Sequence, residues 1–237
     1  METEIMALFE LIKRPYNFIK DLIYPPFCFF CKDFLQAKQD TQNRQVFCKK
    51  CYNAITPVVT STIEVTKKYK IKVFAISDYK NPIRSLILAK GSSDILSAQK
   101  LGELIWELTY LKNAEFDYIV PIALHWRRYA QRGFNQASEI ARAISKKSGK
   151  PVIDLLKRTK STRRQSELVP SKRLLNVHDA FELDMQVLEK NLGKYKNKKI
   201  LLVDDLMTTG ATLKSAAKVL IVLKPKSIVA AVASRVV

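Results

Sequence analysis

The stretch that most constrains this chain is a strand-to-helix junction near its C-terminus. Four apolar residues of buried-strand type, Ile200 to Val203, run directly into the adjacent carboxylates of Asp204 and Asp205. A small, hydroxyl-rich turn follows them. The helical pattern after the turn places apolar residues at Leu213, Ala216, Ala217, Leu220 and Ile221. The sequence therefore predicts a buried strand, an acid pair, a tight turn and an amphipathic helix in direct succession.

This junction has the composition of a site for a phosphorylated sugar. The turn consists of Leu206, Met207, Thr208, Thr209, Gly210, Ala211 and Thr212. The first amide groups of a helix are unpaired and carry partial positive charge, so N–H and hydroxyl donors here can bind a phosphate. The acid pair ends the strand, where open α/β sheets bind ligands, and carboxylates can accept hydrogen bonds from vicinal hydroxyls. An ordinary strand–turn–helix with an Asp helix cap is the alternative.

The charge balance favours polyanionic partners. The 237 residues are 47% apolar, enough for one large or two small folded domains, and carry a net charge of +19. Between Tyr118 and Leu175, fourteen basic residues stand against three acidic ones. A field of this size attracts nucleic acid, an anionic membrane surface or phosphate-rich ligands. Solvated helix faces in a generally basic protein would explain the same excess.

The N-terminal segment, residues 1–24, predicts an amphipathic helix that Pro15 interrupts. We expect it to dock against a partner; binding to a membrane surface, helped by its basic residues, is the alternative. No apolar run is long enough for a transmembrane segment, and the first residues lack the pattern of a signal peptide. The sequence therefore predicts a cytoplasmic protein.

Residues 25–57 contain the pattern of a zinc-binding element. All four cysteines of the chain lie here, in two Cys-x-x-Cys pairs: Cys28, Cys31, Cys48 and Cys51. Two such pairs at this separation are typical of a tetrahedral zinc site, and four thiolate ligands leave no open position, so we expect a structural metal. The segment has too little apolar content to fold without it. Disulfides are the competing interpretation, which a cytoplasmic location disfavours; a redox-active pair is a further one.

Residues 58–116 are predicted to form a bridge and part of a hood over the site. The alternating β-branched residues from Val58 to Val65 suggest an extended linker. A strand is expected over Lys72–Ser77, followed by helices over Pro82–Lys90 and Ile95–Leu111.

A second cluster of polar residues follows the next predicted strand, Tyr118–Leu124. It contains His125, Arg127, Arg128, Arg132, Asn135 and Gln136. Planar guanidinium groups match phosphate oxygens bidentately, so this loop suits a diphosphate. Its aromatic residues Trp126, Tyr129 and Phe134 could stack on bases, although burial in the core explains them equally well. A helix is predicted from Asn135 to Lys147.

The segment from Lys157 to Phe181 is strongly basic and shows no clear period, as expected for a mobile functional loop. We expect it to close over a bound ligand or to contact nucleic acid. Its candidate nucleic-acid-binding residues are Arg158, Lys160, Arg163, Arg164, Lys172 and Arg173. A last buried strand, Ser227–Ser234, completes an alternation of strands and helices that predicts an α/β fold with a parallel sheet and helices on both faces. We expect residues 117–237 to form the principal domain.

The motifs together resemble a known family. The stretch from Ile200 to Thr212 resembles the phosphoribosyl diphosphate (PRPP) motif of type I phosphoribosyltransferases. With Val120–Arg128, Arg132–Ala137 and the four cysteines, the chain from about Pro25 to Val237 looks like the ComF proteins, the bacterial competence-associated branch with a phosphoribosyltransferase-like domain. One departure is Trp126, where Pro is common.

The resemblance implies a role for each residue of the site. Asp204 and Asp205 would bind the ribose hydroxyls, and the turn through Thr212 would hold the 5-phosphate. Arg127, Arg128 and Arg132 would stabilise the leaving diphosphate. Magnesium would enter with PRPP, held chiefly by the ligand's own oxygens. Thr208 occupies a position where purine-salvage relatives place an Asp that can act as general base, which weakens the expectation of a base-assisted reaction.

Two classes of function therefore remain open. The first is a protein of DNA uptake and natural transformation that binds PRPP and single-stranded DNA, with proteins of the competence machinery as partners. The second is an active phosphoribosyltransferase with an amine or nucleobase acceptor. A purely structural adaptor would leave the acid pair and the phosphate turn without a purpose.

Overall fold

The computed structural model describes residues 27–35, 46–89, 94–158, 180–189 and 193–236. The chain forms two compact units, Met1–Ala54 and Ile55–Val237. The predicted N-terminal helix and five of the candidate nucleic-acid-binding residues lie outside the described residues; these five are Lys160, Arg163, Arg164, Lys172 and Arg173. The predicted division of the chain after residues 24, 57 and 116 stays a prediction.

In the first unit, the described residues form two short turns that carry the cysteines. Phe27 and Phe34 form an isolated antiparallel bridge, and the N–H of Cys28 donates to the carbonyl of Asp33 at 2.8 Å. The second turn opens helix α2, Lys49–Asn53, for which Cys48 is the N-terminal cap residue.

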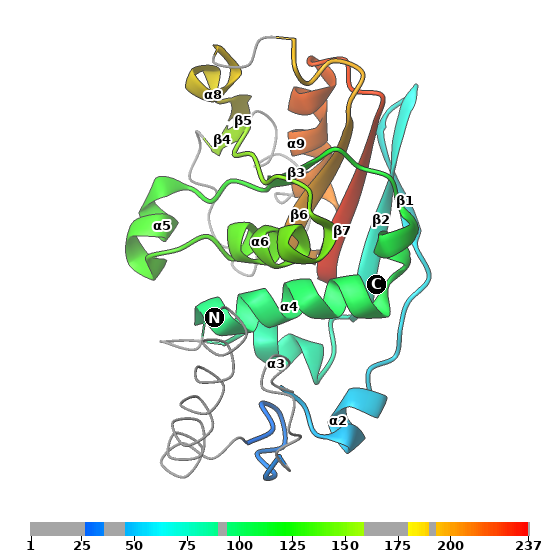
Figure 1. Cartoon of the computed structure of the whole chain (residues 1–237), viewed down its shortest axis with the longest axis vertical. Helices are drawn as coiled ribbons and strands as arrows, with labels where there is room; N and C mark the ends of the chain where they lie inside the picture. The colour runs from blue at the N-terminus through cyan, green and yellow to red at the C-terminus, as the bar shows by residue number, and fades with distance from the viewer. Residues whose placement is uncertain (1–26, 36–45, 90–93, 159–179, 190–192, 237) are drawn as a thin grey trace, which may run out of the picture. The chain divides into compact units, whose positions relative to one another are not determined.

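The second unit is built on a five-stranded sheet in the order β1-β2-β7-β6-β3 (Figure 1). The strands are β1 (Ser61–Thr66), β2 (Tyr69–Asp78), β3 (Tyr118–Pro121), β6 (Lys199–Met207) and β7 (Ser227–Arg235). All neighbours pair in parallel except β1, which is antiparallel to β2. The predicted α/β fold with a mainly parallel sheet is therefore confirmed, with one antiparallel edge strand.

Helices cover both faces of this sheet, because its central strands are apolar on both sides. Leu202 of β6 belongs to the core that includes Leu213 of the helix α9 (Ala211–Ile221), whereas Leu201 points to the opposite face. That face is covered by α4 (Asp94–Leu108) and α6 (Gln136–Ser148), as Figure 1 shows. The remaining elements before β3 are α3 (Ile83–Ile87) and the short 3₁₀ helix η2 (Tyr110–Asn113).

Between β3 and β6 the chain adds elements that the sequence did not reveal. Helix α5 (Trp126–Arg132) precedes α6. A two-stranded antiparallel hairpin, β4 (Leu156–Arg158) with β5 (Phe181–Leu183), and the short helix α8 (Met185–Glu189) follow it. In the sequence, β4 and β5 stand at the two ends of the basic segment Lys157–Phe181, and residues 159–179 of that segment lie outside the described residues.

The extended-linker interpretation of Val58–Val65 was wrong for most of its length. Ser61–Thr66 is strand β1, paired along its length with β2. The pairing adds backbone hydrogen bonds and buries Val65, which is 1% exposed. Alternating β-branched residues fit a half-buried edge strand as well as a linker, so only the partner strand decides between them.

Candidate functional site

The acid pair lies within the last part of β6. The strand continues through Leu206 and Met207, which pair with β7, so the prediction that the acid pair ends the strand and that these two residues belong to the turn was wrong by two residues. Asp204 and Asp205 are both half-buried, and the Oδ1 of Asp204 accepts the N–H of Asp205 at 3.0 Å. Burial raises the pKa of Asp204 well above its usual range, and the negative charge of Asp205 raises it further. Two carboxylates in this setting repel each other, so hydroxyl donors or a cation would stabilise their ionised forms.

The turn after the acid pair leads into α9 through Gly210. This residue has a φ of +72°, a conformation that favours glycine, and caps the helix without a side-chain hydrogen bond. The Oγ1 of Thr209 accepts the N–H of Ala211 at 3.4 Å. A helix N-terminus that begins at a glycine presents backbone N–H groups and partial positive charge, which suits an anion; the weak hydrogen bond to Thr209 engages the N–H of Ala211.

Strand β1 packs against this turn at Gly210 through the side chain of Ile63. A Cβ atom at Gly210 would lie 3.3 Å from the Cγ2 of Ile63, tighter than an ordinary van der Waals contact. A larger residue at position 210 would therefore push against β1 as well as strain the backbone.

The residues after β3 hold the loop beside the acid pair. The N–H of Ile122 donates to the carbonyl of Val203 at 2.8 Å, and the side-chain amide of Asn135 donates to the carbonyl of Ile122 at 2.9 Å. Asn135 also caps α6, since its Oδ1 accepts the N–H of Ala137 at 3.1 Å. Asn135 thus fixes the start of α6 to the strand end that adjoins Asp204.

The three predicted diphosphate-binding arginines have different surroundings. Arg127 is exposed, with its guanidinium 5.4 Å from the centre of the Trp126 ring. Arg132 is exposed and donates to the Oε1 of Gln136 at 2.9 Å. Arg128 is half-buried, and its charge acts on Arg158. Of the three, Arg128 is the arginine whose charge acts on Arg158, and Arg158 in turn interacts with Asp204.

Arg158 was expected among the nucleic-acid-binding residues, and in the structure its charge acts on Asp204 of the acid pair. Its guanidinium lies 5.2 Å from the centre of the Phe181 ring, across the β4–β5 hairpin. Burial, and then the charge of Arg128, lower the pKa of Arg158, while Asp204 raises it. Arg158 thus interacts electrostatically with both Arg128 and Asp204. A three-residue strand has no readable period, so the sequence carried no signal for this placement.

His125 precedes α5 and caps it. Its Nδ1 accepts the N–H of Arg127 at 3.3 Å, and its side chain is 5% exposed. Burial lowers the pKa of His125, and so do the charges of Arg127, Arg158 and Arg128. The neutral imidazole that this environment favours is the form that can accept the helix-capping hydrogen bond.

The four cysteines of the first unit form a cluster suited to a metal ion. Their sulfur atoms all lie within 4.8 Å of one another, the Sγ atoms of Cys31 and Cys48 are 3.6 Å apart, and all four are free thiols. A tetrahedral site with Zn–S bonds of about 2.3 Å has sulfur atoms about 3.8 Å apart. The four cysteines can therefore hold a metal such as zinc.

The backbone around Cys28 favours its thiolate form. Burial alone would raise the pKa of Cys28, but hydrogen bonds from the backbone of Cys48, Cys31 and Phe30 lower it to about 6. Hydrogen bonds from main-chain N–H groups to sulfur are the expected surroundings of a metal-binding thiolate.

A comparison with protein families identifies the domain to which the residues of this site belong. The phosphoribosyl transferase domain model matches residues 92–235, well over half of the chain. The chain belongs to this family. The matched phosphoribosyl transferase domain contains the acid pair, the turn into α9, Arg128 and Arg158.

Three relatives of this chain have names that refer to competence or to DNA utilization. Competence protein F of Haemophilus influenzae is 35% identical over 43% of this chain and 43% of its own length. Competence protein ComFC of Bacillus subtilis is 28% identical over 63% of this chain and 56% of its own length. DNA utilization protein YhgH of Escherichia coli is 27% identical over 63% of this chain and 66% of its own length. The expected homology to ComF proteins is confirmed as a distant one, and each match spans less than two thirds of the relative.

One solved structure is also similar, the allosteric regulatory enzyme of purine biosynthesis. The similarity covers 57% of this chain and 25% of that one, at 14% identity and a TM-score of 0.36. The fold assignment therefore depends on the topology and the family match rather than on this structure.

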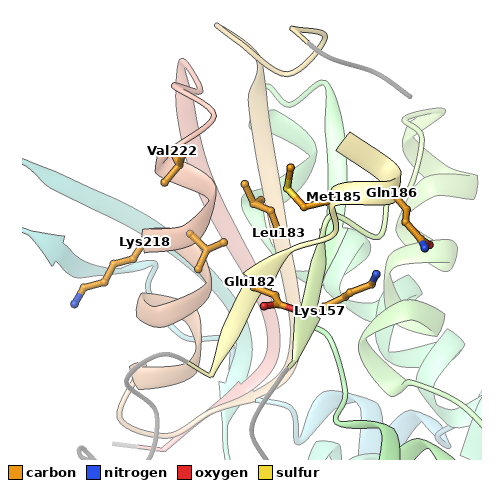
Figure 2. Close-up of a pocket in the computed structure, with 8 residues that line it drawn as sticks. Lys157, Glu182, Leu183, Met185, Gln186, Lys218 and Val222 are labelled. Carbon is orange, nitrogen blue, oxygen red and sulfur yellow. The ribbon is translucent and has the colours of Figure 1, made fainter. Parts of the chain in front are cut away.

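The phosphoribosyl transferase domain also has a pocket of about 620 Å³ away from the acid pair (Figure 2). The pocket lies between the β4–β5 hairpin, α8 and α9, and is lined by Lys157, Glu182, Leu183, Met185, Gln186, Lys218, Val219 and Val222. Successive residues of a strand point to opposite faces, so Lys157 faces this pocket while Arg158 faces the other way. Among the described residues, no helix has the length and apolar character to cross a membrane.

Proposed function

We propose that this chain binds Mg-PRPP at the carboxyl end of β6 and handles single-stranded DNA, as a ComF-like protein of DNA uptake and natural transformation. The observations that support the PRPP site are the electrostatic interactions of Asp204 with Arg158 and of Arg158 with Arg128, together with the glycine that begins α9. Carboxylates for a diol, guanidinium groups for a diphosphate and helix amides for a terminal phosphate match the three parts of PRPP.

Each group has a distinct task in this proposal. Asp204 and Asp205 accept hydrogen bonds from the ribose hydroxyls, and Thr208, Thr209, Gly210 and Thr212 surround the 5-phosphate. Arg128 and Arg158 neutralise the diphosphate, with Arg127 and Arg132 nearby on α5. Magnesium, when bound, supplies charge neutralisation and needs few protein ligands because the diphosphate and ribose provide oxygens. Zinc on the four cysteines has a structural role, because four thiolates complete its tetrahedral coordination.

The proposal that this chain handles single-stranded DNA rests on its net positive charge and on the names of its relatives. The net charge of +19 favours a polyanion, and the relatives are named for competence and DNA utilization. The alternative is an active phosphoribosyltransferase that transfers the ribosyl phosphate to an amine or a nucleobase. Thr208 stands in the turn as a hydroxyl that cannot take a proton at neutral pH, so an acceptor would have to bring its own reactive amine.

Diphosphate release from Mg-PRPP separates the two alternatives. The assay uses zinc-loaded full-length protein, with and without a panel of nucleobases and amines, and compares it with the Asp204→Asn/Asp205→Asn variant. Release that the double substitution abolishes would establish the enzyme and identify its acceptor. Binding of PRPP without release would support a regulatory ligand in a DNA-handling protein. Absence of both binding and release would contradict the proposed PRPP site.

A further inference from the structure

Helix α5 makes no contribution to the core of the protein. None of its seven residues, Trp126–Arg132, is buried. Most helices in proteins are stabilised by packing one face against the core, and a helix this short is marginal without it. Here the caps hold it in place: His125 accepts an N–H at its start, and the N–H of Gly133, at a φ of +78°, donates to the carbonyl of Tyr129 at 2.7 Å. The exposed side chains of α5, among them Trp126, Arg127 and Tyr129, can therefore contact a partner.

Two aromatic rings on α5 face the solvent. Trp126 is 66% exposed and Tyr129 is 53% exposed. Residues three apart in a helix lie on the same side, so the two rings share one face of α5. Leaving two large rings largely in water forgoes the free energy that their burial would give.

The charge on α5 identifies the kind of partner. The helix carries Arg127, Arg128 and Arg132 and has no acidic residue. The guanidinium of Arg127 lies 5.4 Å from the centre of the Trp126 ring, so a cation and a stacking surface stand side by side. Phosphates at one edge and flat rings at the other are what the nucleotides of a single strand present.

We propose that α5 is the docking surface for single-stranded nucleic acid, with Trp126 and Tyr129 stacking on bases and the exposed Arg127 and Arg132 binding phosphates. This inference rests on the DNA-handling part of the proposed function and names its contact surface. Double-stranded DNA keeps its bases stacked inside and would reach only the arginines. A membrane is a poorer match, since α5 has no aliphatic face beyond Ala130 to insert into lipid.

Fluorescence of Trp126 tests the proposal directly. The chain has two tryptophans, so Trp106→Phe leaves Trp126 as the only one. Titration with a decathymidylate should quench its emission, whereas a DNA duplex of the same length should not. Binding is measured in parallel by fluorescence anisotropy on the full-length, zinc-loaded protein.

The variants separate stacking from charge. Trp126→Ala and Tyr129→Ala should each weaken binding about 5-fold or more, with an unchanged slope of log affinity against log salt. Trp126→Phe keeps an aromatic ring at this position and should retain most of the affinity that Trp126→Ala loses. Arg127→Gln should weaken binding and reduce that slope by about 0.7. Tyr110→Ala is the matched control, because Tyr110 is 73% exposed but lies on η2, outside this surface.

The outcomes distinguish this inference from the function on which it rests. If the native chain binds the oligonucleotide and both alanine variants bind it equally well, α5 is not the docking surface, while DNA binding stands. If the native chain binds no single strand at low salt, the DNA-handling function fails and this inference fails with it. Equal affinity for a mononucleotide, or preference for anionic vesicles over the oligonucleotide, would also overturn the inference.

Discussion

Arg158, the last residue of β4, interacts electrostatically with Asp204 at the carboxyl end of β6. The guanidinium lowers the pKa of Asp204, but burial and the charge of Asp205 raise it by more. The ionised form of Asp204 therefore costs folding free energy at neutral pH. That cost is expected of a binding site, where groups are placed for a ligand rather than for the stability of the fold.

The first prediction concerns this cost. A carboxyl group whose pKa is raised in the folded chain holds its proton more tightly there than in the unfolded chain. Its contribution to stability is therefore greatest below the ordinary pKa of about 3.9 and is lost as the pH rises toward the folded value. Asp204→Asn removes the penalty, so it should raise the melting temperature at pH 7, by about 2–4 °C for each kcal/mol gained.

Thermal unfolding between pH 3.5 and pH 8 measures this effect. The gain from Asp204→Asn should shrink toward zero at the acid end of the range, where the native Asp204 is protonated. Asp154→Asn, at an exposed carboxylate, is the control and should change little. A melting temperature that falls at pH 7 for Asp204→Asn would show that the carboxylate stabilises the fold instead.

The second prediction uses neighbouring residues of β4 with opposite orientation. Arg158→Gln should weaken Mg-PRPP binding at least 10-fold, because a hydrogen bond between charged groups contributes about 1.5–3 kcal/mol. Lys157→Gln removes the same charge from the other face of the strand and should leave PRPP affinity unchanged. Equilibrium binding of PRPP to the two variants measures the difference. Equal losses of PRPP affinity would show that Arg158 acts only through the overall positive charge of the chain and not through a direct contact.

The third prediction concerns the metal. The purified chain should contain one zinc ion, and a strong chelator should make residues of the first unit sensitive to a protease while the second unit stays resistant. Cys51→Ser should have the same effect without a chelator. Metal analysis and limited proteolysis measure both. A proteolysis pattern that chelation leaves unchanged would remove the structural role of the metal.

The fourth prediction concerns the packing of α4 on α6. A Cβ atom at Gly102 would lie 2.6 Å from the carbonyl oxygen of Ile140 and 2.7 Å from the Cβ of Ala143. Gly-to-Ala in a helix normally stabilises by about 1 kcal/mol, but Gly102→Ala should destabilise the chain by about 1–3 kcal/mol because the helices must move apart. Combining it with Ala143→Gly should recover part of the loss in denaturant unfolding, and a stabilising Gly102→Ala would show that the helices separate freely.

Much of the fold could be predicted because its signals are local. The succession of strand β6, turn and helix α9 follows from a short apolar run, a hydroxyl-rich stretch with glycine and a period of 3.6 residues, although β6 extends two residues past the acid pair and α9 begins at Ala211. Helix α6 was likewise predicted to within a residue at each end, since it has an amphipathic pattern and an Asn cap. The cysteine spacing was sufficient to predict the cluster that the structure contains.

The missed features depend on contacts that no local pattern records. Strand β1 exists because β2 pairs with it, and Arg158 reaches Asp204 only through the hairpin with β5. Helix α5 has no apolar face, so periodicity could not reveal it; Gly133 as a C-terminal cap was the one available signal. The exposure of Trp126 and Tyr129 also needed the structure, since the sequence allowed stacking and burial equally.

The most direct test of the proposed site is calorimetric titration of Mg-PRPP into the native chain and into Asp204→Asn/Asp205→Asn. The native protein should show saturable binding of one PRPP per chain. The double variant should lose at least 100-fold in affinity and should remain folded, because Asp204→Asn relieves repulsion between the two carboxylates. Equal affinity in the two proteins would contradict the assignment of the ribose hydroxyls to the acid pair of β6.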